Sequence, residues 1–398
     1  MGRIIMSRGR EESIRRFHPW IFSGGIHKTE GKIEEGDIVE VLSSNGERLG
    51  FGHYQTGSIS VRMLTFGEED FTPGFWHKKI DAAYTLRKSL GITAGLTNAY
   101  RLVHGEGDSL PGLIIDIYNN AAVVQTHSAG MFLSRGIIAE TLKKIFGPKL
   151  TSIYDKSETT APYKAGLELL DGYIYGSSPD NPIILENGIS FSVDWEGGQK
   201  TGFFLDQRDN RQLVRRYSQG RRVLNLFCYT GGFSLYALAG GAKSADSVDS
   251  SQKAIDLLNI NMEINRNASL FPKETPANSF CTDAIEFLKN SKDDVYDLMI
   301  VDPPAFAKHR GALSNALRAY QRLNAAAIEK IAPGGIIFTY SCSQVVDKTA
   351  FAQTIFSAAA QTGRNVRILH RLTQPADHPV NIYHPEGEYL KGLVLYVE

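Results

Sequence analysis

The stretch from residue 221 to residue 251 constrains the fold more than any other part of the chain. Residues 223–227 are a short apolar run, which is typical of a strand buried on both faces. Two glycines follow within residues 229–232 and allow a sharp turn that brings the backbone close to a ligand. Residues 233–239 are apolar at helical spacing, and residues 247–249 end a second short strand in a carboxylate. This order predicts a strand, a turn, a helix and a strand within a parallel sheet.

Such a unit is suited to hold a nucleoside, because the helix N-terminus faces the ligand and Asp249 can accept hydrogen bonds from ribose hydroxyls. The dinucleotide fingerprint Gly-x-Gly-x-x-Gly is absent. The stretch instead resembles motifs I and II of the class I S-adenosylmethionine methyltransferases, whose sulfonium cofactor carries no pyrophosphate and needs no three spaced glycines. On this stretch alone, a purely structural unit without a ligand is the alternative.

Length and composition predict a globular protein with about two or three domains. The chain has 398 residues, of which 42% are hydrophobic, and its formal net charge is +0, so any affinity for nucleic acid must come from local patches. The three cysteines, Cys228, Cys281 and Cys342, fit neither a disulfide framework nor a metal knuckle, and we expect no metal site. No apolar run reaches membrane-spanning length, which predicts a cytoplasmic protein without membrane contacts.

The first domain, residues 1–74, is predicted to be a small all-β unit. Residues 38–42 and 48–52 flank an Asn-Gly pair and predict a hairpin, and residues 59–64 alternate as a further strand. The opening segment is basic and precedes aromatic residues. Its arginines are Arg3, Arg8, Arg10, Arg15 and Arg16, and Phe17-His18-Pro19-Trp20 follows them.

Arginine beside exposed aromatic side chains suits RNA phosphates and stacked bases, so Arg16 and Trp20 are candidate RNA-binding residues. The alternative is a solvated arginine face with Trp20 in a small core. The layout of residues 1–74 resembles a PUA domain, an RNA-binding barrel found in many RNA-modifying enzymes. That resemblance favours RNA as the partner.

Residues 75–184 predict a second domain, of the α+β class. We expect helices over residues 75–90 and 132–146, and strands over residues 113–118, 121–126 and 151–155. The polar, glycine-rich loop of residues 105–112 either has a binding role or is a plain connection. The loop-like residues 177–182 mark a boundary, and residues 185–398 are the predicted catalytic domain.

The most informative tripeptide of the catalytic domain is Asp302-Pro303-Pro304. It follows residues 296–301, a predicted buried strand, and two prolines in succession make the chain leave the sheet rigidly. Nucleic-acid methyltransferases use such a turn to hold a flipped-out base beside the methyl donor, and a structural diproline turn is the alternative. Asp283, which ends another predicted strand, either accepts from an adenine amino group or caps the next helix.

Cys342 is the candidate nucleophile. We expect the Pro-Gly-Gly sequence at residues 333–335 to break the chain before a strand over residues 336–340, and Cys342 comes directly after Ser341 at the end of that strand. A cysteine at the carboxyl end of a parallel strand faces the crevice where ligands bind, and its thiolate is a strong nucleophile. The alternative is a buried, inert thiol, which we expect for Cys228 and Cys281.

Two segments are rich in basic residues. Residues 200–222 hold seven lysines or arginines and two aspartates, and residues 308–322 hold Lys308, Arg310, Arg318 and Arg322 without an acid. Both segments suit RNA phosphates, and solvated helix faces are the alternative. The chain ends in two predicted strands, residues 366–372 and 391–397. Asp377-His378-Pro379, in the loop between them, is a base, a substrate contact or a turn.

Taken together, the motifs resemble the RlmI family of bacterial large-subunit (23S) rRNA cytosine-5 methyltransferases over nearly the full length. The matching segments are His18-Pro19-Trp20, residues 205–209, residues 229–233, Asp302-Pro303-Pro304, Ser341-Cys342-Ser343, residues 376–379 and residues 389–392. The resemblance implies an α/β, Rossmann-like methyltransferase domain with a mostly parallel seven-stranded sheet and a terminal antiparallel hairpin. A small β-barrel PUA domain and a small α+β domain precede it.

The resemblance also implies S-adenosylmethionine as the cofactor, 23S rRNA as the partner and 5-methylcytosine as the product. The implied cofactor-site residues are Gln207, Arg208, Phe227, Tyr229, Gly231, Gly232, Asp249, Ser250, Asp283 and Asp302. The implied catalytic residues are Cys342, which would add to cytosine C6, and Asp302, which would hydrogen-bond N3. The candidate substrate contacts are Pro303, Pro304, Phe306, Arg16 and Trp20.

The chain departs from many RNA cytosine-5 methyltransferases at one position. Those enzymes carry a second cysteine, after a proline of the Asp302 motif, that is thought to assist product release, and here the segment Pro303-Pro304-Ala305 has no thiol. The base that removes the C5 proton is unassigned. Methylation of a base nitrogen, which needs no thiol, and non-catalytic RNA binding on a vestigial fold are the alternative functions. The oligomeric state stays open, with a homodimer as one option.

Overall fold

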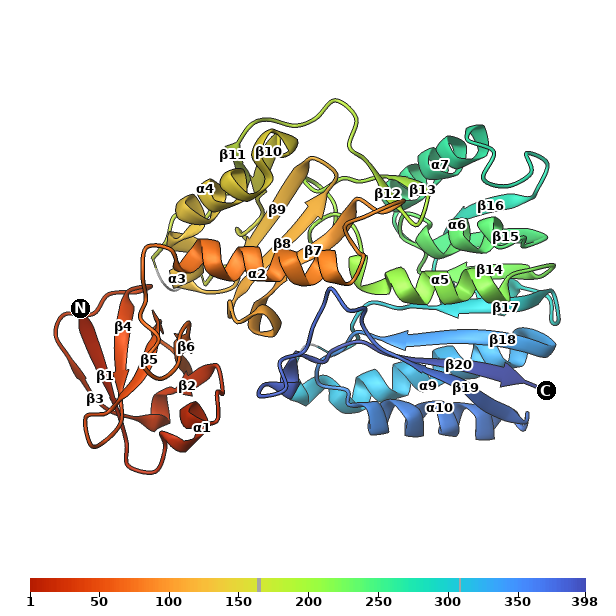
Figure 1. Cartoon of the computed structure of the whole chain (residues 1–398). Helices are drawn as coiled ribbons and strands as arrows, with labels where there is room; N and C mark the ends of the chain where they lie inside the picture. Colours follow the sequence, from red (N-terminus) through yellow and green to blue (C-terminus); the bar gives the residue numbers. More distant parts are fainter. Residues whose placement is uncertain (163–165, 308) are drawn as a thin grey trace. The chain divides into compact units, whose positions relative to one another are not determined.

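A computed structural model (Figure 1) describes residues 1–162, 166–307 and 309–398. The described residues form two compact units. Unit 1 comprises Met1–Leu185, Val193–Leu205 and Ala376–Gly387, and unit 2 comprises Glu186–Ser192, Asp206–Pro375 and Glu388–Glu398. The chain therefore leaves unit 2 at Pro375 and returns to it at Glu388. The division into three domains, residues 1–74, 75–184 and 185–398, stays a prediction.

Unit 1 begins with a six-stranded sheet in the order β2-β6-β5-β4-β1-β3. Its elements are β1 (Gly2–Met6), α1 (Glu12–Arg15), β2 (Trp20–Phe22), η1 (Ser23–Gly25), β3 (Ile26–Glu30), β4 (Ile38–Leu42), β5 (Arg48–Tyr54) and β6 (Ile59–Met63). Apolar residues alternate along β4, so Val39 and Val41 are buried in a core with Ile4 and Val61. The predicted hairpin, now β4 and β5, and the following strand β6 are confirmed.

The second sheet of unit 1 has five strands in the order β11-β10-β9-β8-β7. The elements are α2 (Phe75–Ser89), β7 (Ala99–His104), η2 (Gly105–Asp108), β8 (Leu113–Tyr118), β9 (Ala121–Thr126), α3 (Ala129–Leu133), α4 (Arg135–Phe146), η3 (Gly147–Lys149), β10 (Ser152–Asp155) and β11 (Gly172–Tyr175). The predicted helix over residues 132–146 is confirmed from Arg135 to Phe146 as α4, but its predicted start is wrong. The side chain of Ser128 accepts a hydrogen bond from Met131 N and starts α3 early, and Ser134 separates α3 from α4.

Unit 2 is built on a seven-stranded sheet in the order β16-β15-β14-β17-β18-β20-β19. After β12 (Ile183–Glu186), which enters unit 2 only at its last residue, and β13 (Ile189–Ser192), the elements are η5 (Leu205–Gln207), α5 (Arg208–Tyr217), β14 (Arg222–Leu226), α6 (Gly232–Ala239), β15 (Ser244–Asp249), α7 (Gln252–Asn267), β16 (Ala277–Cys281), α8 (Ala284–Asn290), β17 (Tyr296–Val301), η6 (Arg310–Ala312), α9 (Leu313–Lys330), β18 (Ile331–Ser341), α10 (Lys348–Thr362), β19 (Val366–Leu372) and β20 (Lys391–Val397). The short helix η7 (Pro385–Gly387), between β19 and β20 in the chain, belongs to unit 1. Strands β14 to β18 pair in parallel, and β20 is antiparallel to both β18 and β19. The predicted sheet with its terminal antiparallel hairpin is confirmed.

Helices cover both faces of this sheet (Figure 1): α9 and α10 lie on one face, and α5, α6 and α7 lie on the other. On the first face Met299 and Ile337 of the strands share a core with Tyr320, Ile328 and Phe351 of the helices. The strand order reverses between β14 and β17, the neighbouring strands at the centre. In an open α/β sheet such a reversal opens a ligand crevice at the carboxyl ends of the strands.

The predicted chain break at residues 333–335 is wrong, because β18 runs without interruption from Ile331 to Ser341. Tyr296 of β17 pairs with Ile331, whereas Leu298 pairs with Ile336. The additional residues of β18 bulge between these two pairs, so the sheet absorbs the Pro-Gly-Gly sequence as an irregularity. Among the described residues, no helix is long and apolar enough to span a bilayer.

Candidate active site

The turn between β14 and α6 carries an uncommon backbone conformation. Phe227 and Tyr229 have φ angles of 58° and 47°, and Gly231 has a φ of 83°. A Cβ atom on Gly231 would lie 2.9 Å from Cγ of Leu258, so both the backbone and the packing require glycine there. Positive φ angles at non-glycine residues store strain, which is common where a loop holds a ligand. The geometry fits a loop that approaches a nucleoside closely.

Asp249 ends β15 and is held in place by the neighbouring loops. Its Oδ2 accepts a hydrogen bond of 2.9 Å from Tyr229 N, and its Oδ1 accepts one of 2.9 Å from Ser251 N. Ser250 lies between Asp249 and Ser251 in the chain. Each carboxylate oxygen keeps a further lone pair, so a fixed Asp249 can still accept from two ribose hydroxyls. This acceptor set fits the ribose of S-adenosylmethionine.

Asp283 follows β16 and caps α8. Its Oδ1 accepts hydrogen bonds from Ile285 N at 2.9 Å and from Glu286 N at 3.0 Å. Of the two roles considered for Asp283, the structure contains the N-cap. Contact with an adenine amino group stays a prediction, and it would have to use the second oxygen, Oδ2.

Asp302 follows β17 and is oriented by a buried amide. Gln207 Nε2 donates a hydrogen bond of 3.0 Å to Asp302 Oδ2, and Asn210 Nδ2 donates one of 2.6 Å to Gln207 Oε1. Gln207 is 3% exposed. The structure therefore places Gln207, expected beside the cofactor, against the catalytic candidate Asp302. Arg208, the first residue of α5, is also buried, with Nε 3.7 Å from Asp209 Oδ1.

A buried ion pair lies beneath the start of α6 and joins α5 to the end of β12. Arg211 Nε and Nη2 donate to Glu186 Oε1 and Oε2 at 2.7 and 2.8 Å, and both side chains are almost fully buried. Burial by itself lowers the pKa of Arg211, but the Glu186 carboxylate outweighs burial and raises it. A Cβ atom on Gly232 would lie 3.0 Å from Cδ of Arg211, so the glycine admits this side chain beneath the start of α6.

The predicted basic stripe over residues 200–222 is therefore wrong in part. Arg208 and Arg211 are buried and so cannot be part of an exposed basic stripe. The pattern of charges did not reveal this, because the partner Glu186 lies outside the segment. A buried bidentate pair is a signal that only the folded chain displays.

The Asp302-Pro303-Pro304 turn is joined to the end of β18. Ser343 Oγ donates a hydrogen bond of 2.5 Å to Ala307 O, and Phe306 packs on Tyr320 with 4.7 Å between the ring centroids. Within the turn, Pro303 is buried and Pro304 is exposed. Phe306 is thus partly committed to the core, whereas Pro304 remains accessible to a substrate.

Cys342 lies just after β18 and is half-buried, between the buried residues Ser341 and Ser343. Ser341 Oγ donates a hydrogen bond of 3.0 Å to the Tyr320 hydroxyl. Burial raises the pKa of Tyr320 to about 12, and the charges of Cys342 and Asp302 add to this effect. The Tyr320 hydroxyl is therefore within electrostatic range of both catalytic candidates, which the structure brings to neighbouring strand ends.

Lys391 is a site residue for which the sequence motif gave no role. It is the first residue of β20, pairs with Ser341 across the sheet, and donates a hydrogen bond of 2.5 Å from Nζ to Ser343 O. Its side chain is buried, and burial lowers the pKa of Lys391 to about 8, against the opposing charges of Cys342, Asp347 and Glu388. A lysine in the closing hairpin thus places a cation beside the residues that flank Cys342.

The other two cysteines differ from each other. Cys228 is buried, and burial raises the pKa of its thiol well above the ordinary value, as expected for a packing residue. Cys281 is exposed, so its predicted packing role is wrong. It ends β16, which is the edge strand of the sheet and is covered by no further strand on that side.

The basic segment after the diproline turn lines open hollows on α9 and α10. Lys308 lies outside the described residues. Arg310 and Arg318 line a hollow of about 570 Å³, and Arg318 and Arg322 line another of about 360 Å³. No acidic side chain lines either hollow among the described residues. The two hollows share Arg318, and we call them together the α9 groove; binding of RNA phosphates there stays a prediction.

In unit 1, the candidate RNA-binding residues have different surroundings. Arg16 is exposed. Trp20 is half-buried: its Nε1 donates a hydrogen bond of 2.9 Å to Glu106 Oε1, and its ring lies 4.2 Å from that of His384. Trp20 is therefore packed against its neighbours, as the alternative to RNA binding predicts. Phe17 and Phe22 are exposed aromatic rings in the same segment.

The motif at Asp377-His378-Pro379 is a structural anchor within unit 1. Asp377 Oδ2 accepts a hydrogen bond of 3.0 Å from Arg101 N, and Asp377 O accepts one of 2.8 Å from Arg87 Nη2. A Cβ atom on Gly107 would lie 1.9 Å from Pro379 O. The glycine-rich loop of residues 105–112 therefore packs closely against the segment that holds Pro379.

Comparison with known proteins agrees with this geometry. The sequence model of the S-adenosylmethionine-dependent methyltransferase family matches residues 171–393, and that of the PUA-like domain matches residues 4–66. Ribosomal RNA large subunit methyltransferase I of Aeromonas hydrophila is 41% identical over 399 residues, covering 98% of each chain. The enzyme of the same name from Photobacterium profundum is 41% identical over 401 residues, covering 99% of each chain.

Solved structures resemble the chain over its whole length. A methyltransferase complexed with SAH has a TM-score of 0.84 at 24% identity, and a SAM-dependent methyltransferase from Streptococcus mutans has a TM-score of 0.82 at 23% identity, each covering 100% of both chains. At these identities the likeness establishes the fold, with a PUA-like and a Rossmann-like part. The cofactor follows from the family match, and it is S-adenosylmethionine. The chain belongs to the ribosomal RNA large subunit methyltransferase I family of S-adenosylmethionine-dependent methyltransferases.

Proposed function

We propose that this enzyme methylates carbon 5 of a cytosine in large-subunit (23S) rRNA, through a covalent bond between Cys342 Sγ and cytosine C6. One observation carries the proposal. Cys342 and Asp302 directly follow the adjacent parallel strands β18 and β17, at the carboxyl ends of these strands. The substrate class is supported by the relatives, which are named as methyltransferases of ribosomal RNA of the large subunit. A ribosomal substrate places the enzyme in the cytoplasm.

The chemistry explains why both residues are needed. Carbon 5 of cytosine is a weak nucleophile. Addition of the Cys342 thiolate to C6 moves electron density to C5 and N3, while Asp302 in its protonated form donates a hydrogen bond or its proton to N3 and so stabilises the adduct. The bound cofactor supplies an electrophilic sulfonium methyl group. Loss of the C5 proton then allows Cys342 to leave, and Gln207 keeps the Asp302 carboxylate aimed throughout.

Lys391 would favour the reactive form of the nucleophile. The Cys342 charge acts to raise the pKa of Lys391, against the larger effect of burial, and by reciprocity the Lys391 ammonium stabilises a Cys342 thiolate. The chain has no second cysteine at the diproline turn. Charge stabilisation from Lys391 would also assist departure of Cys342 from C6, because the sulfur leaves as a thiolate.

The RNA would approach along basic surfaces. In unit 2, the α9 groove, lined by Arg310, Arg318 and Arg322, begins after the diproline turn and follows α9. In unit 1, the PUA-like part exposes Arg16 and Phe17. Arginine binds phosphates, and an aromatic ring stacks on unpaired bases. We propose that these surfaces hold the rRNA segment around the target cytosine.

A covalent trap tests the function directly. RNA that contains 5-fluorocytosine should hold the wild-type enzyme as a stable complex in the presence of S-adenosylmethionine, because fluorine at C5 cannot leave as a proton does. Cys342→Ala should form no such complex and should lose methyl transfer, yet bind the cofactor normally. Cys281→Ser is the matched control, since Cys281 is an exposed thiol beside Ser250, on the proposed cofactor side and not at the strand end that carries Cys342. Methylation of rRNA by Cys342→Ala at a near-normal rate would replace the proposal by methylation of a base nitrogen.

A further inference from the structure

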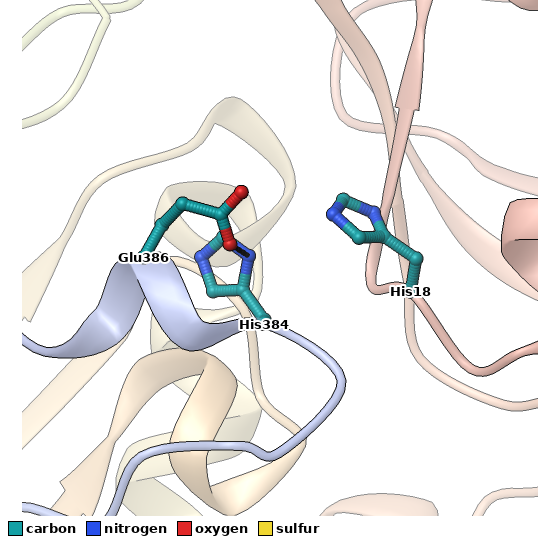
Figure 2. Close-up of side chains that lie close together, drawn as sticks. All are labelled: His18, His384 and Glu386. Carbon is teal, nitrogen blue, oxygen red and sulfur yellow. Dashed lines mark ion pairs between the residues drawn. The ribbon is translucent and has the colours of Figure 1, made fainter.

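Three side chains of types that commonly bind metal ions lie together in unit 1. They are His18, His384 and Glu386 (Figure 2). One ligand atom of each lies within 4.8 Å of the others. His18 precedes β2, whereas His384 and Glu386 lie at η7 in the segment Ala376–Gly387. Methyl transfer at Cys342 uses none of them. The sequence predicted no metal site, because the residues are far apart along the chain.

The His384 side chain contains a buried nitrogen without a hydrogen bond. Its side chain is 3% exposed, and Nδ1 has no hydrogen-bond partner among the described residues. Glu386 Oε2 lies 3.1 Å from this nitrogen, but the directions of the two groups do not form a hydrogen bond. A buried polar atom that is left without a hydrogen bond destabilises a protein. A native protein therefore usually provides such an atom with a partner.

The His18 side chain has the arrangement of a metal ligand. Its Nδ1 lies 3.1 Å from Trp20 O and 3.2 Å from Trp20 N, so the backbone engages that nitrogen. Metal-binding histidines commonly have one ring nitrogen held in this way, which orients the other toward the ion. Figure 2 shows the His18 ring facing the pair formed by His384 and Glu386. The two imidazole rings are 5.6 Å apart at an angle of 84°.

The charges around His384 favour a cation. The carboxylates of Glu106 and Glu386 both act on the His384 ring, and a metal binds the neutral form of histidine. The two carboxylates near His384 would in turn offset the charge of a divalent ion.

We propose that His18, His384 and Glu386 bind one divalent cation of the zinc class. Two imidazole nitrogens and one carboxylate oxygen are a common zinc set, with a fourth position for water. Bonds of about 2.0–2.2 Å hold neighbouring ligand atoms about 3.5 Å apart. The cluster must therefore contract by roughly 1.3 Å, and rotation of the Glu386 side chain, which is 58% exposed, would bring its carboxylate closer to the two rings.

The ion would fasten the segment Ala376–Gly387 to the start of β2. That segment leaves and re-enters unit 2 along the chain, and its other anchor is Asp377. The His384 ring also packs on Trp20, so the ion would fix this aromatic cluster. Since a ligand that binds only the folded state stabilises it, Zn²⁺ should raise the melting temperature.

The test uses the full-length protein after removal of metals with a chelator. Zn²⁺ alone is titrated against a chromophoric chelator, and one equivalent should bind to the wild type. Glu386→Gln should weaken that binding by at least about tenfold, and His384→Gln should weaken it further. His27→Gln is the matched control, because His27 is exposed on β3. Cys281→Ser controls for zinc bound to an exposed thiol.

Thermal unfolding gives the second readout. Zn²⁺ should raise the melting temperature of the wild type and of His27→Gln, but not that of Glu386→Gln. Because Glu386 is exposed, its substitution leaves the fold intact even if His384→Gln does not fold. The proposal is overturned if the wild type binds no stoichiometric Zn²⁺, if Glu386→Gln and His18→Gln bind it as tightly as the wild type, or if Cys281→Ser alone loses it.

Discussion

The Gln207 side chain donates a hydrogen bond of 3.0 Å from Nε2 to Asp302 Oδ2, within a buried chain that continues to Asn210. The amide therefore fixes which face of the carboxylate is left for a substrate. A hydrogen bond to a charged group contributes about 1.5–3 kcal/mol. If Asp302 contacts the base as proposed, Gln207 would act through it as a positioning residue.

Gln207→Ala should lower kcat by roughly tenfold to a hundredfold, because Asp302 loses its orientation. The Kd for S-adenosylmethionine should stay within about twofold of the wild type if Gln207 does not touch the cofactor. Single-turnover methylation and calorimetry measure the two quantities. Gln219→Ala, an exposed glutamine just after α5, is the control. A large loss of cofactor affinity would return Gln207 to the cofactor site.

Asp249→Ala should weaken binding of S-adenosylmethionine by about 1.5–3 kcal/mol, since a charge-assisted contact to a ribose hydroxyl is lost. The loop that donates to Asp249 from Tyr229 N and Ser251 N should also loosen. Calorimetry with the folded variant measures the affinity. Asp256→Ala, an exposed position on α7, should bind normally. Equal affinities of the two variants would move the nucleoside site elsewhere.

The activity should depend on the charge of Lys391. Burial lowers its pKa to about 8, so the ammonium is present below that pH and is lost above it. We expect the rate of methyl transfer to fall on the alkaline side through pH about 8. Lys391→Met should lower the rate at neutral pH by roughly tenfold or more and should lose this alkaline limb. Lys391→Arg should restore part of the rate and extend the limb to higher pH.

The stability of the same variants separates charge from structure. Folding lowers the pKa of Lys391 from 10.5 to about 8, so the unfolded chain binds the proton more tightly. The buried ammonium therefore destabilises the fold below pH about 8, and this penalty disappears as the pH rises toward 10.5. Lys391→Met should remove this pH dependence of the free energy of unfolding. Loss of activity that follows loss of stability would argue against the electrostatic role.

The buried pair of Glu186 and Arg211 should be a stability element. Arg211→Met leaves a buried carboxylate without its partner and should reduce the free energy of unfolding by about 3–5 kcal/mol. The double variant Glu186→Gln with Arg211→Met should recover part of that loss, because no unpaired charge remains. Denaturation in urea measures both. Equal destabilisation of the single and double variants would show that packing, and not the unpaired charge, determines the effect.

The α9 groove should contribute to RNA affinity. Arg318→Glu and Arg322→Glu should weaken binding of rRNA fragments, and each lost phosphate contact should reduce the salt slope by about 1. Cofactor affinity should be unchanged. Lys273→Glu, an exposed charge reversal before β16, should have little effect on either. Unaltered RNA affinity and salt slope in the arginine variants would leave their charges as a solvated helix face.

The amino-acid sequence by itself determined the elements whose signals are local. The apolar runs of β14, β17 and β20, the glycines before α6 and the diproline turn after β17 are readable because each depends on its immediate neighbours. The position of Cys342 directly after a strand end followed from the same local signals, whereas the seven-stranded sheet was implied by the resemblance and its strand order came from the structure. The predicted break at residues 333–335 was wrong, because the Pro-Gly-Gly sequence lies within β18, whose residues on both sides pair with β17.

Only the tertiary structure decided which side chains meet. Gln207 with Asp302, Lys391 with the loop of Cys342, Glu186 with Arg211 and His18 with His384 are pairs from distant segments. No sequence periodicity relates such residues, because their contact depends on the packing of elements that lie far apart in the sequence. Burial then sets their chemistry: the same Arg211 that reads as an exposed charge in sequence is an ion-pair partner once water is excluded.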